Sequence, residues 1–283
     1  MTAKSPDLRS FTGFLLRRAY VRAVGIEQSC IGDDARMREV AALTILAELG
    51  PLSQRELAAL THISPTVMVK LVDALEARSW VTRERKTADR RAYALRLTEA
   101  GRAALQGFSR DLDSSDKELT AGLTPDEISW LNNHLRTLLA GDPALQVSAM
   151  ADRTAYLITH AHQRTRERAQ QHLAELDLHP RDFGLLAVIG RDEPCTQSHI
   201  AGSLGVSDPA ILPALDVLEA RGLLTRGRNA SDRRLVDVRL TPEGRSVFGL
   251  AQRQASTLQA ELVQRLGPTD HEVLRGLLSR IVG

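Results

Sequence analysis

The segment DRRAYALRLTEAGR (Asp89–Arg102) is the most informative part of the sequence, because a near copy, DRRLVDVRLTPEGR, stands at Asp232–Arg245. The two segments are 232 − 89 = 143 residues apart. At the same spacing LEAR at Leu75–Arg78 recurs at Leu218–Arg221, and 20 of the 52 positions from Pro51 to Arg102 are identical to their counterparts. Self-similarity at a fixed spacing indicates a duplicated domain.

Two copies are too few for a solenoid and favour a fused dimer. We expect the first repeat to occupy residues 1–141 and the second residues 142–283. The join predicts a helix that ends near Ala140–Gly141 and a new helix with Asp142 as N-cap and Pro143 at its first position.

Composition sets the class of protein. A chain of 283 residues with 43% hydrophobic content is long enough for about two ordinary domains with real cores. The net charge is only +2, so affinity for an acidic partner must come from local patches. The two cysteines exclude a disulfide framework, and no apolar run resembles a membrane span or a signal peptide. We therefore expect a soluble cytoplasmic protein with no membrane partner.

Each repeat is predicted to be mostly helical. Apolar residues recur at helical spacing over 35–49, and the helix should end at Gly50–Pro51. Ser53 and Glu56 form the capping-box pattern of a short helix over 53–60. Ser64 can cap a following helix with Pro65 at its first position. That helix is expected to bury Val67, Leu71 and Leu75.

A hairpin and long helices are expected next. Residues 80–85 and 93–97 alternate like two short strands, and helical patterns begin at Thr98 and Pro125. The order is that of a winged helix–turn–helix, which presents its second helix to the DNA major groove. Cations gather at the hairpin in both copies, which suits phosphates and the narrow minor groove.

The pattern Asp-x-Arg-x-x-x-Leu-x-Leu-Thr-x-x-Gly resembles the wing signature of the MarR family of bacterial transcription regulators. The first copy matches throughout, and the second has one Leu-to-Val change at Val238. The matching residues are Asp89, Arg91, Leu95, Leu97, Thr98 and Gly101, then Asp232, Arg234, Val238, Leu240, Thr241 and Gly244. Family members are usually homodimers of subunits near half this length, so the chain resembles two subunits joined head to tail.

The resemblance implies a mainly α protein with small β wings. Its two winged helix–turn–helix domains would be joined by long dimerisation-type helices into a single-chain pseudo-dimer that is monomeric in solution. It also implies that Arg91 and Arg234 enter the minor groove, each held by an ion pair with Asp89 or Asp232. A solvated hairpin is the alternative reading of these cations. The full set of predicted DNA-binding residues is Ser64, Thr66, Lys70, Arg83, Arg85, Lys86, Asp89, Arg90, Arg91, Ser207, Arg226, Arg228, Asp232, Arg233 and Arg234.

Pockets between the long helices and the winged domain often take aromatic acids in this family. The resemblance therefore implies a small anionic aromatic effector, although packing between helices explains the same side chains equally well. The candidate residues are Arg17, Tyr20, Tyr156, His160 and Arg164.

No catalytic pattern is present in the sequence. His160 and His162 fall on different helix faces, and there is no HExxH, paired-cysteine, phosphate-loop or nucleophile-elbow motif. Cys30 and Cys195 lack basic neighbours in sequence and are expected to be inert. We expect no enzyme activity, no cofactor and no metal.

The leading hypothesis is a ligand-responsive, sequence-specific repressor that binds double-stranded DNA. The alternative is a protein-interaction or antirepressor module, because Lys70 is the one cation of the first recognition helix before Arg78 and none precedes Arg221. The second recognition helix carries Asp208 and Pro213, which predict a kinked first turn or a restart near Leu212. We therefore expect an asymmetric operator with one well-specified half.

Overall fold

The computed structural model describes residues 7–283 except 33, 62, 86–92, 147 and 229–235. The chain forms two compact units. The first comprises Met1–Arg18 and His162–His271, and the second comprises Ala19–Ala161 and Glu272–Gly283. Neither unit coincides with a sequence repeat, because each combines the winged helix–turn–helix of one repeat with a terminal segment of the other.

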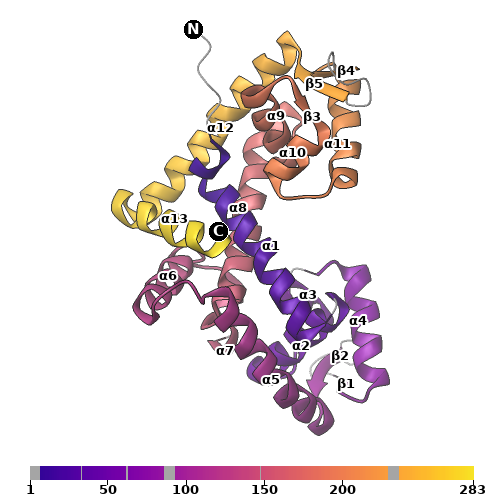
Figure 1. Ribbon diagram of the computed structural model, residues 1–283. Coiled ribbons are helices and arrows are strands. Elements are labelled where there is room, and N and C mark those ends of the chain that lie inside the picture. The colour runs from indigo at the N-terminus through magenta and orange to yellow at the C-terminus, as the bar shows by residue number, and fades with distance from the viewer. Residues whose placement is uncertain (1–6, 33, 62, 86–92, 147, 229–235) are drawn as a thin grey trace. The chain divides into compact units, whose positions relative to one another are not determined.

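The second unit contains the winged domain of the first repeat (Figure 1). Long helix α1 leads into it, and α8 leads out of it. Its elements, with those two helices, are α1 (Thr12–Ile31), α2 (Asp34–Leu49), α3 (Gln54–Thr61), α4 (Pro65–Ala77), β1 (Val81–Arg85), β2 (Tyr93–Leu97), α5 (Glu99–Leu119), α6 (Pro125–Leu138), η2 (Pro143–Gln146), α7 (Ser148–Ala151) and α8 (Thr154–Leu173).

The first unit contains the winged domain of the second repeat. A short strand, β3, is added to the edge of its wing, next to β5. The elements are η1 (Leu8–Ser10), η3 (Ala174–Leu176), α9 (Pro180–Asp192), β3 (Cys195–Thr196), α10 (Gln197–Leu204), α11 (Asp208–Ala220), β4 (Leu224–Arg228), β5 (Val236–Leu240) and α12 (Pro242–Leu266). The last helix, α13 (Pro268–Val282), begins in the first unit and belongs to the second from Glu272 onward.

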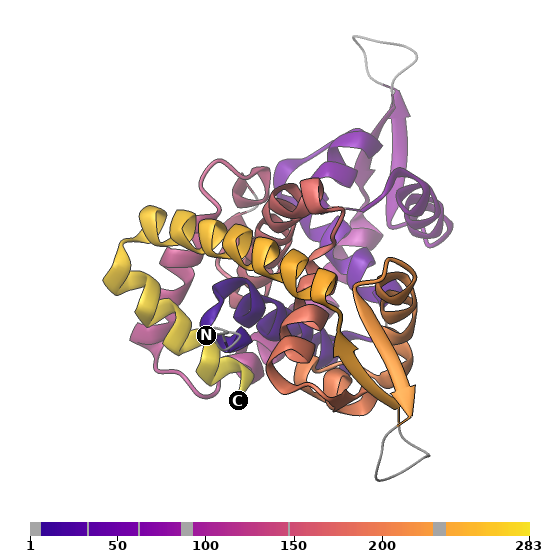
Figure 2. The same cartoon turned by 90° about the horizontal axis from the view of Figure 1, so that it is seen from above.

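The spacing of the sequence repeat is kept by the secondary structure. Helix α10 begins 197 − 54 = 143 residues after α3, and α11 begins 208 − 65 = 143 residues after α4. The wing strands β4 and β5 follow β1 and β2 at the same spacing, and both pairs are antiparallel with five residues per strand. The predicted tandem of winged helix–turn–helix domains is confirmed, and Figure 2 shows each strand pair extending from its own helices.

Helix starts follow the predicted caps in part. The Ser53 N–H donates to Glu56 Oε2 at 2.7 Å and the Glu56 N–H donates to Ser53 Oγ at 3.2 Å, so the capping box is confirmed. Ser64 stands at the N-cap of α4, but its side chain makes no capping hydrogen bond. The join is more segmented than predicted. Pro143 begins a short 3-10 helix, and the next long helix begins only at Thr154.

The buried face of α4 differs by one residue from the predicted face. Met68, Leu71, Val72 and Leu75 are buried, at the i, i+3, i+4, i+7 spacing of a helix stripe. Val67 is 37% exposed, so its predicted burial is wrong. The helix turns 100° per residue, and Met68 rather than Val67 shares the face of Leu71 and Leu75.

Helix α11 runs without interruption from Asp208 to Ala220, so the predicted restart near Leu212 is wrong. Pro213 lies inside the helix and lacks the N–H that would bond the Pro209 carbonyl. The first turn is closed by the Ala210 N–H on the Ser207 carbonyl at 3.0 Å, an i+3 bond. In α4 the equivalent bond runs from the Met68 N–H to the Ser64 carbonyl, an i+4 bond. The first turn of α11 is therefore tighter than that of α4, and the helix continues through Pro213.

Each winged domain has its own apolar core. In the first repeat Leu43 and Leu46 of α2 pack with Leu57, Met68 and Leu95. The corresponding core of the second repeat draws residues from each helix and strand of its winged domain, including Leu186, Ile200, Leu215 and Val238. Within the described residues no single helix is long and apolar enough to span a membrane. Only the pair α10–α11, bent by 112°, meets that length and composition.

The Leu-Thr-x-x-Gly end of each repeated motif forms the junction between wing and long helix. The Gly101 N–H donates to Thr98 Oγ1 at 3.0 Å, and the Thr98 hydroxyl donates to the Ser79 carbonyl at 2.6 Å. Gly244, Thr241 and Gly222 repeat this arrangement at 2.9 and 2.7 Å. A Cβ on Gly101 would overlap the Trp80 carbonyl oxygen, and one on Gly244 would overlap that of Leu223. Glycine is therefore required by close backbone approach.

Gly101→Ala should lower the free energy of unfolding by about 1–3 kcal/mol, because the new methyl group displaces backbone rather than a flexible side chain. Gly107→Ala is the matched control, since Gly107 lies in the same helix with open space around its Cβ position. It should raise stability by roughly 0.5–1 kcal/mol through helix propensity. Urea unfolding measures the free energy of unfolding of both variants. Equal effects would contradict the conclusion that close backbone approach requires glycine at position 101.

Candidate nucleic-acid interface

Helix α4 presents a mixed face to solvent on the outer side of its winged domain (Figure 1). Thr66, Val67, Val69, Lys70 and Asp73 are exposed, opposite the buried stripe. The predicted DNA-binding residues Thr66 and Lys70 thus lie on an accessible surface. Ser64, at the helix start, is exposed as well.

Helix α11 presents a different face at the same repeat positions. Pro209, Ala210, Leu212, Pro213 and Val217 are exposed, together with Ser207 and two acidic residues, Asp208 and Asp216. The Asp208 carboxylate accepts a hydrogen bond from the Ser198 hydroxyl of α10 at 2.5 Å. The described face contains no cation before Arg221, so the charge asymmetry predicted from sequence is present in the fold.

Arg83 lies between two carboxylates of the recognition helix. Its Nη2 donates to Asp73 Oδ1 at 2.8 Å, and its Nη1 pairs with Glu76. These bonds, the one to Asp73 first, hold the pKa of Arg83 above its ordinary value. The guanidinium therefore joins β1 to the C-terminal half of α4.

Arg226 repeats this contact in the second copy. Its Nη2 donates to Asp216 Oδ1 at 2.6 Å, and its Nε donates to Glu219 Oε2 at 2.9 Å. The backbone N–H of Arg226 adds a further bond, to Glu219 Oε1 at 3.1 Å. Hydrogen bonding to Arg226 lowers the pKa of Glu219. We call each such arrangement, Arg83–Asp73–Glu76 and Arg226–Asp216–Glu219, a wing clamp.

The wing clamps change the reading of two predicted DNA-binding residues. Arg83 and Arg226 each have two carboxylate partners, so neither presents a free guanidinium to phosphate. The sequence analysis missed the acidic partners, although both are identical in the two repeats. Asp73 corresponds to Asp216 and Glu76 to Glu219, and this shared identity was the available signal.

The remaining wing cations are partly described. The Arg85 guanidinium lies over the Tyr93 ring at 6.0 Å from its centroid, and Arg96 pairs across the strands with Glu84 at 2.8 Å. Arg228 ends β4 opposite Val236. The other predicted wing residues lie outside the described residues: Lys86, Asp89, Arg90, Arg91, Asp232, Arg233 and Arg234.

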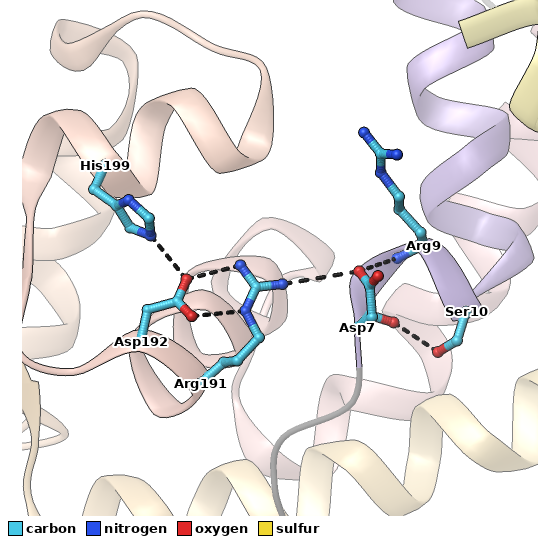
Figure 3. A network of polar contacts seen from close by, with 6 residues as sticks. All are labelled: Asp7, Arg9, Ser10, Arg191, Asp192 and His199. Atoms are coloured by element: carbon cyan, nitrogen blue, oxygen red, sulfur yellow. Dashed lines mark hydrogen bonds and ion pairs between the residues drawn. The ribbon is translucent and has the colours of Figure 1, made fainter. Parts of the chain in front are cut away.

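A polar network in the first unit fixes α10 to its neighbours (Figure 3). Arg191 donates two hydrogen bonds to Asp192, at 2.8 and 2.7 Å, and its Nη1 lies 3.8 Å from Asp7. His199 Nε2, in the first turn of α10, lies 2.8 Å from the same Asp192 carboxylate. The Arg191 bonds, and then the His199 bond, lower the pKa of Asp192 to about 2 against the opposing effect of burial. The first repeat has Leu49 and Glu56 at the positions of Asp192 and His199, so this network belongs to the second copy.

The predicted effector residues fall into different units. In the second unit Tyr156 and His160 of α8 are buried with their rings 4.2 Å apart, and burial, more than the charges of Asp142 and Glu48, raises the pKa of Tyr156. Tyr20, on α1, is half-buried in the same unit. Arg17 and Arg164 belong to the first unit. Tyr156 packs with the apolar core, which is the packing role left open from sequence.

Arg17 has surroundings that suit an anion. Its Nη1 donates to the Leu204 carbonyl at 3.0 Å, at the C-terminal end of α10. Burial, and then the charge of Arg18, lowers the pKa of Arg17. Burial, then Arg17 and Arg166, lowers the pKa of His162 to about 4. Across the described part of the chain no carboxylate pairs with Arg17 or Arg18, so positive charge gathers here without compensation.

Cys195 is buried beside β5, and burial, with Asp192 and Asp237, raises the pKa of its thiol to about 11. A thiol with so high a pKa is a poor nucleophile at neutral pH. No group of three metal-ligating side chains occurs in the ranges that the structure describes.

Comparison with known proteins matches both winged domains. Residues 36–93 match a model described as MarR family, and residues 176–235 match a second model of that description. The HTH-type transcriptional regulator YpoP of Bacillus subtilis (strain 168) is 32% identical over 95 residues, which cover 34% of this chain and 67% of YpoP. The chain belongs to the MarR family.

Other MarR-like matches cover a single half. The HTH-type transcriptional repressor NicR of Pseudomonas putida is 34% identical over 106 residues, or 36% of this chain and 65% of NicR, slightly under two thirds. The structure of the transcriptional repressor CouR bound to a 23-mer DNA duplex is 30% identical and covers 46% of this chain and 92% of CouR, with a TM-score of 0.45. Membership of the MarR family, with its match to an HTH-type transcriptional regulator, supports DNA-binding transcription regulation as the function class of this chain.

Arg226→Met should lower the free energy of unfolding by about 1 kcal/mol, because Asp216 and Glu219 would keep their charges without a partner. Arg226→Lys should recover part of the loss, since an ammonium cannot reproduce the forked contact. Arg253→Met is the matched control on exposed α12 and should change stability by less than ~0.5 kcal/mol. Chemical denaturation gives the free energy of unfolding of each variant. Equal losses for Arg226→Met and Arg253→Met would show that the wing clamp does not stabilise the fold.

Proposed function

We propose that this MarR family protein is a sequence-specific DNA-binding repressor. A single chain forms a pseudo-dimer, and a small anionic ligand releases it from DNA. The observation that carries the proposal is the duplicated winged helix–turn–helix, with a wing clamp at the same position in each copy. A helix for the major groove and a cationic wing for the adjacent backbone are thereby held together twice.

Base and phosphate contacts are assigned to the accessible residues of α4 and the wings. Thr66 and Lys70 would reach base edges, and Arg85 would contact phosphate. We keep the proposed minor-groove role of Arg91 and Arg234 from the wing signature. Arg83 and Arg226 are better assigned as positioning residues, because their guanidinium groups are already paired.

The pseudo-dimer is supported by exchange of terminal segments between the sequence repeats 1–141 and 142–283. In the first unit Thr12, from the first repeat, lies 2.8 Å from His271 Nε2 of the second, and both side chains are buried. In the second unit Arg280 of the second repeat pairs with Glu127 of the first. Terminal helices that pair within one chain would normally pair between two subunits, and fusion removes the concentration dependence of that pairing.

An asymmetric operator follows from the two recognition faces. Helix α4 offers Thr66 and Lys70, whereas α11 offers Ser207 and a series of aliphatic residues. We propose that the first half-site is read more strictly than the second, which depends more on wing charge and DNA shape.

The effector site is proposed at Arg17, with Arg18 and Arg166 as further cations. Arg17 now bonds the C-terminal carbonyl of α10, and an aromatic carboxylate would compete for its donors. Loss of that bond would alter the turn at Gly205, directly before α11. The ligand would thereby change the recognition helix of the second copy.

A protein-interaction or antirepressor role remains the second candidate. The specific observation in its favour is the exposed face of α11, which is apolar and acidic and has no cation before Arg221 in the described chain.

Selection from a random duplex library should enrich an operator with two unequal half-sites about one helical turn apart. Lys70→Ala should reduce discrimination in one half, whereas Arg234→Ala should weaken binding to all sequences and reduce the salt slope by about one. Sequencing after several rounds and titration over a range of salt concentrations provide the measurements. Absence of enrichment at moderate salt would favour the interaction module.

The ligand response is tested with 4-hydroxybenzoate as the anionic probe and phenol as its neutral counterpart. The anion should weaken binding of the wild-type protein to the selected duplex, and phenol should not. Arg17→Gln should retain DNA binding and lose the response, whereas Arg22→Gln, an exposed change on the same helix, should keep it. An undiminished response of Arg17→Gln would remove Arg17 from the effector site.

A further inference from the structure

Both recognition helices expose an aliphatic side chain at the same repeat position. Val69 of α4 is 45% exposed and Leu212 of α11 is 37% exposed, and their numbers differ by 212 − 69 = 143. Each is the fifth residue of its helix, so both lie within the first two turns. Val67 and Ala210 are a second exposed apolar pair two residues earlier.

The polar side chains of these faces are largely committed to other partners. Asp73 and Asp216 bind the guanidinium groups of the wing clamps, and Asp208 accepts the Ser198 hydroxyl. On α4 this leaves Thr66 and Lys70 as hydrogen-bonding readers. On α11, within Asp208–Ala220, the other fully exposed side chains are aliphatic or proline, so hydrogen bonds from its middle turns cannot read base edges.

We propose that Val69 and Leu212 read thymine by contact with its C5-methyl group in the major groove. Thymine is the one base of ordinary DNA that presents a methyl group there, and apolar side chains recognise it. The N-terminal half of the second helix of a helix–turn–helix is the part that approaches base edges. This readout rests on the proposed DNA-binding function and specifies its chemistry.

A protein partner fits these faces less well. A stable protein interface buries about 800 Å² on each side, and one or two exposed aliphatic residues per turn supply only a small part of it. The faces also lie beside wing strands that carry exposed arginines, Arg85 beside α4 and Arg239 in the second wing. Cations next to a narrow apolar strip match the phosphates and thymine methyl groups of a duplex.

The test replaces thymine by deoxyuridine, which removes only the methyl group. A duplex enriched by the full-length protein is resynthesised with single dT→dU changes across both half-sites, and its affinity is measured by titration. Removal of a contacted methyl group should weaken binding about fourfold, equivalent to ~0.8 kcal/mol. We expect at least one sensitive thymine in each half-site.

Variants assign each sensitive thymine to a helix. Val69→Ala should abolish the loss of affinity caused by dT→dU changes (the uracil effect) in one half-site. Leu212→Ala should abolish it in the other. Val273→Ala, which changes a 43% exposed valine of α13, should leave both effects intact. These side chains are solvent-exposed, so folding should be unaffected by their truncation.

The outcomes separate the readout from the proposed function. A duplex that is enriched and tightly bound but insensitive to every dT→dU change overturns the methyl readout and leaves DNA binding in place. A uracil effect that survives in both Val69→Ala and Leu212→Ala overturns the assignment of the readers. If no duplex is enriched, the proposed function fails and the readout fails with it.

Discussion

The pairing of one guanidinium with two carboxylates is the interaction on which each proposed DNA-binding surface depends. Asp73 and Glu76 lie in the C-terminal half of α4, where negative charge is unfavourable to the helix dipole. Arg83 compensates them from the adjacent strand, and Arg226 does the same for Asp216 and Glu219. The contact links wing and recognition helix beyond the short turn between them, so the two elements are held in a fixed relation before any DNA is bound.

Much of this architecture could be predicted from the sequence, because it follows from the spacing of apolar residues and from the repeated segments. The repeat spacing, the order of helices and strands, and the capping box at Ser53 follow from local patterns. The failures arose where a tertiary contact decides the outcome. Val67 was predicted to be buried, but the buried stripe begins at the next residue, Met68. A restart near Leu212 was predicted, but α11 continues through Pro213. The acidic partners of Arg83 were not predicted, because a sequence does not show which acidic groups surround a cation, and the DNA-contact role of Arg83 stays a prediction.

Fusion of the two repeats explains why they have the same backbone fold but different surface residues. In a homodimer every substitution appears twice, whereas here each copy can change alone. The second copy has the Asp192–His199 contact, the Ser198–Asp208 bond and Pro213, which have no counterpart in the first copy, while the 143-residue spacing of the elements is the same. Residues that support the fold, such as Thr241 and Gly244, are retained. These particular differences lie at α10 and α11, the elements that would face DNA.

The position of these differences bears on how a ligand would act. The Arg17 bond ends at Leu204, and α11 begins at Asp208 after a turn through Gly205, whose φ of 67° holds a left-handed conformation. A ligand shifts an equilibrium only by its differential affinity for two states. An anion that binds Arg17 better when the Leu204 carbonyl is released would favour a displaced α11. Because α11 has few polar readers, its displacement would cost the methyl and wing contacts together, while the reading of bases by α4 could remain intact.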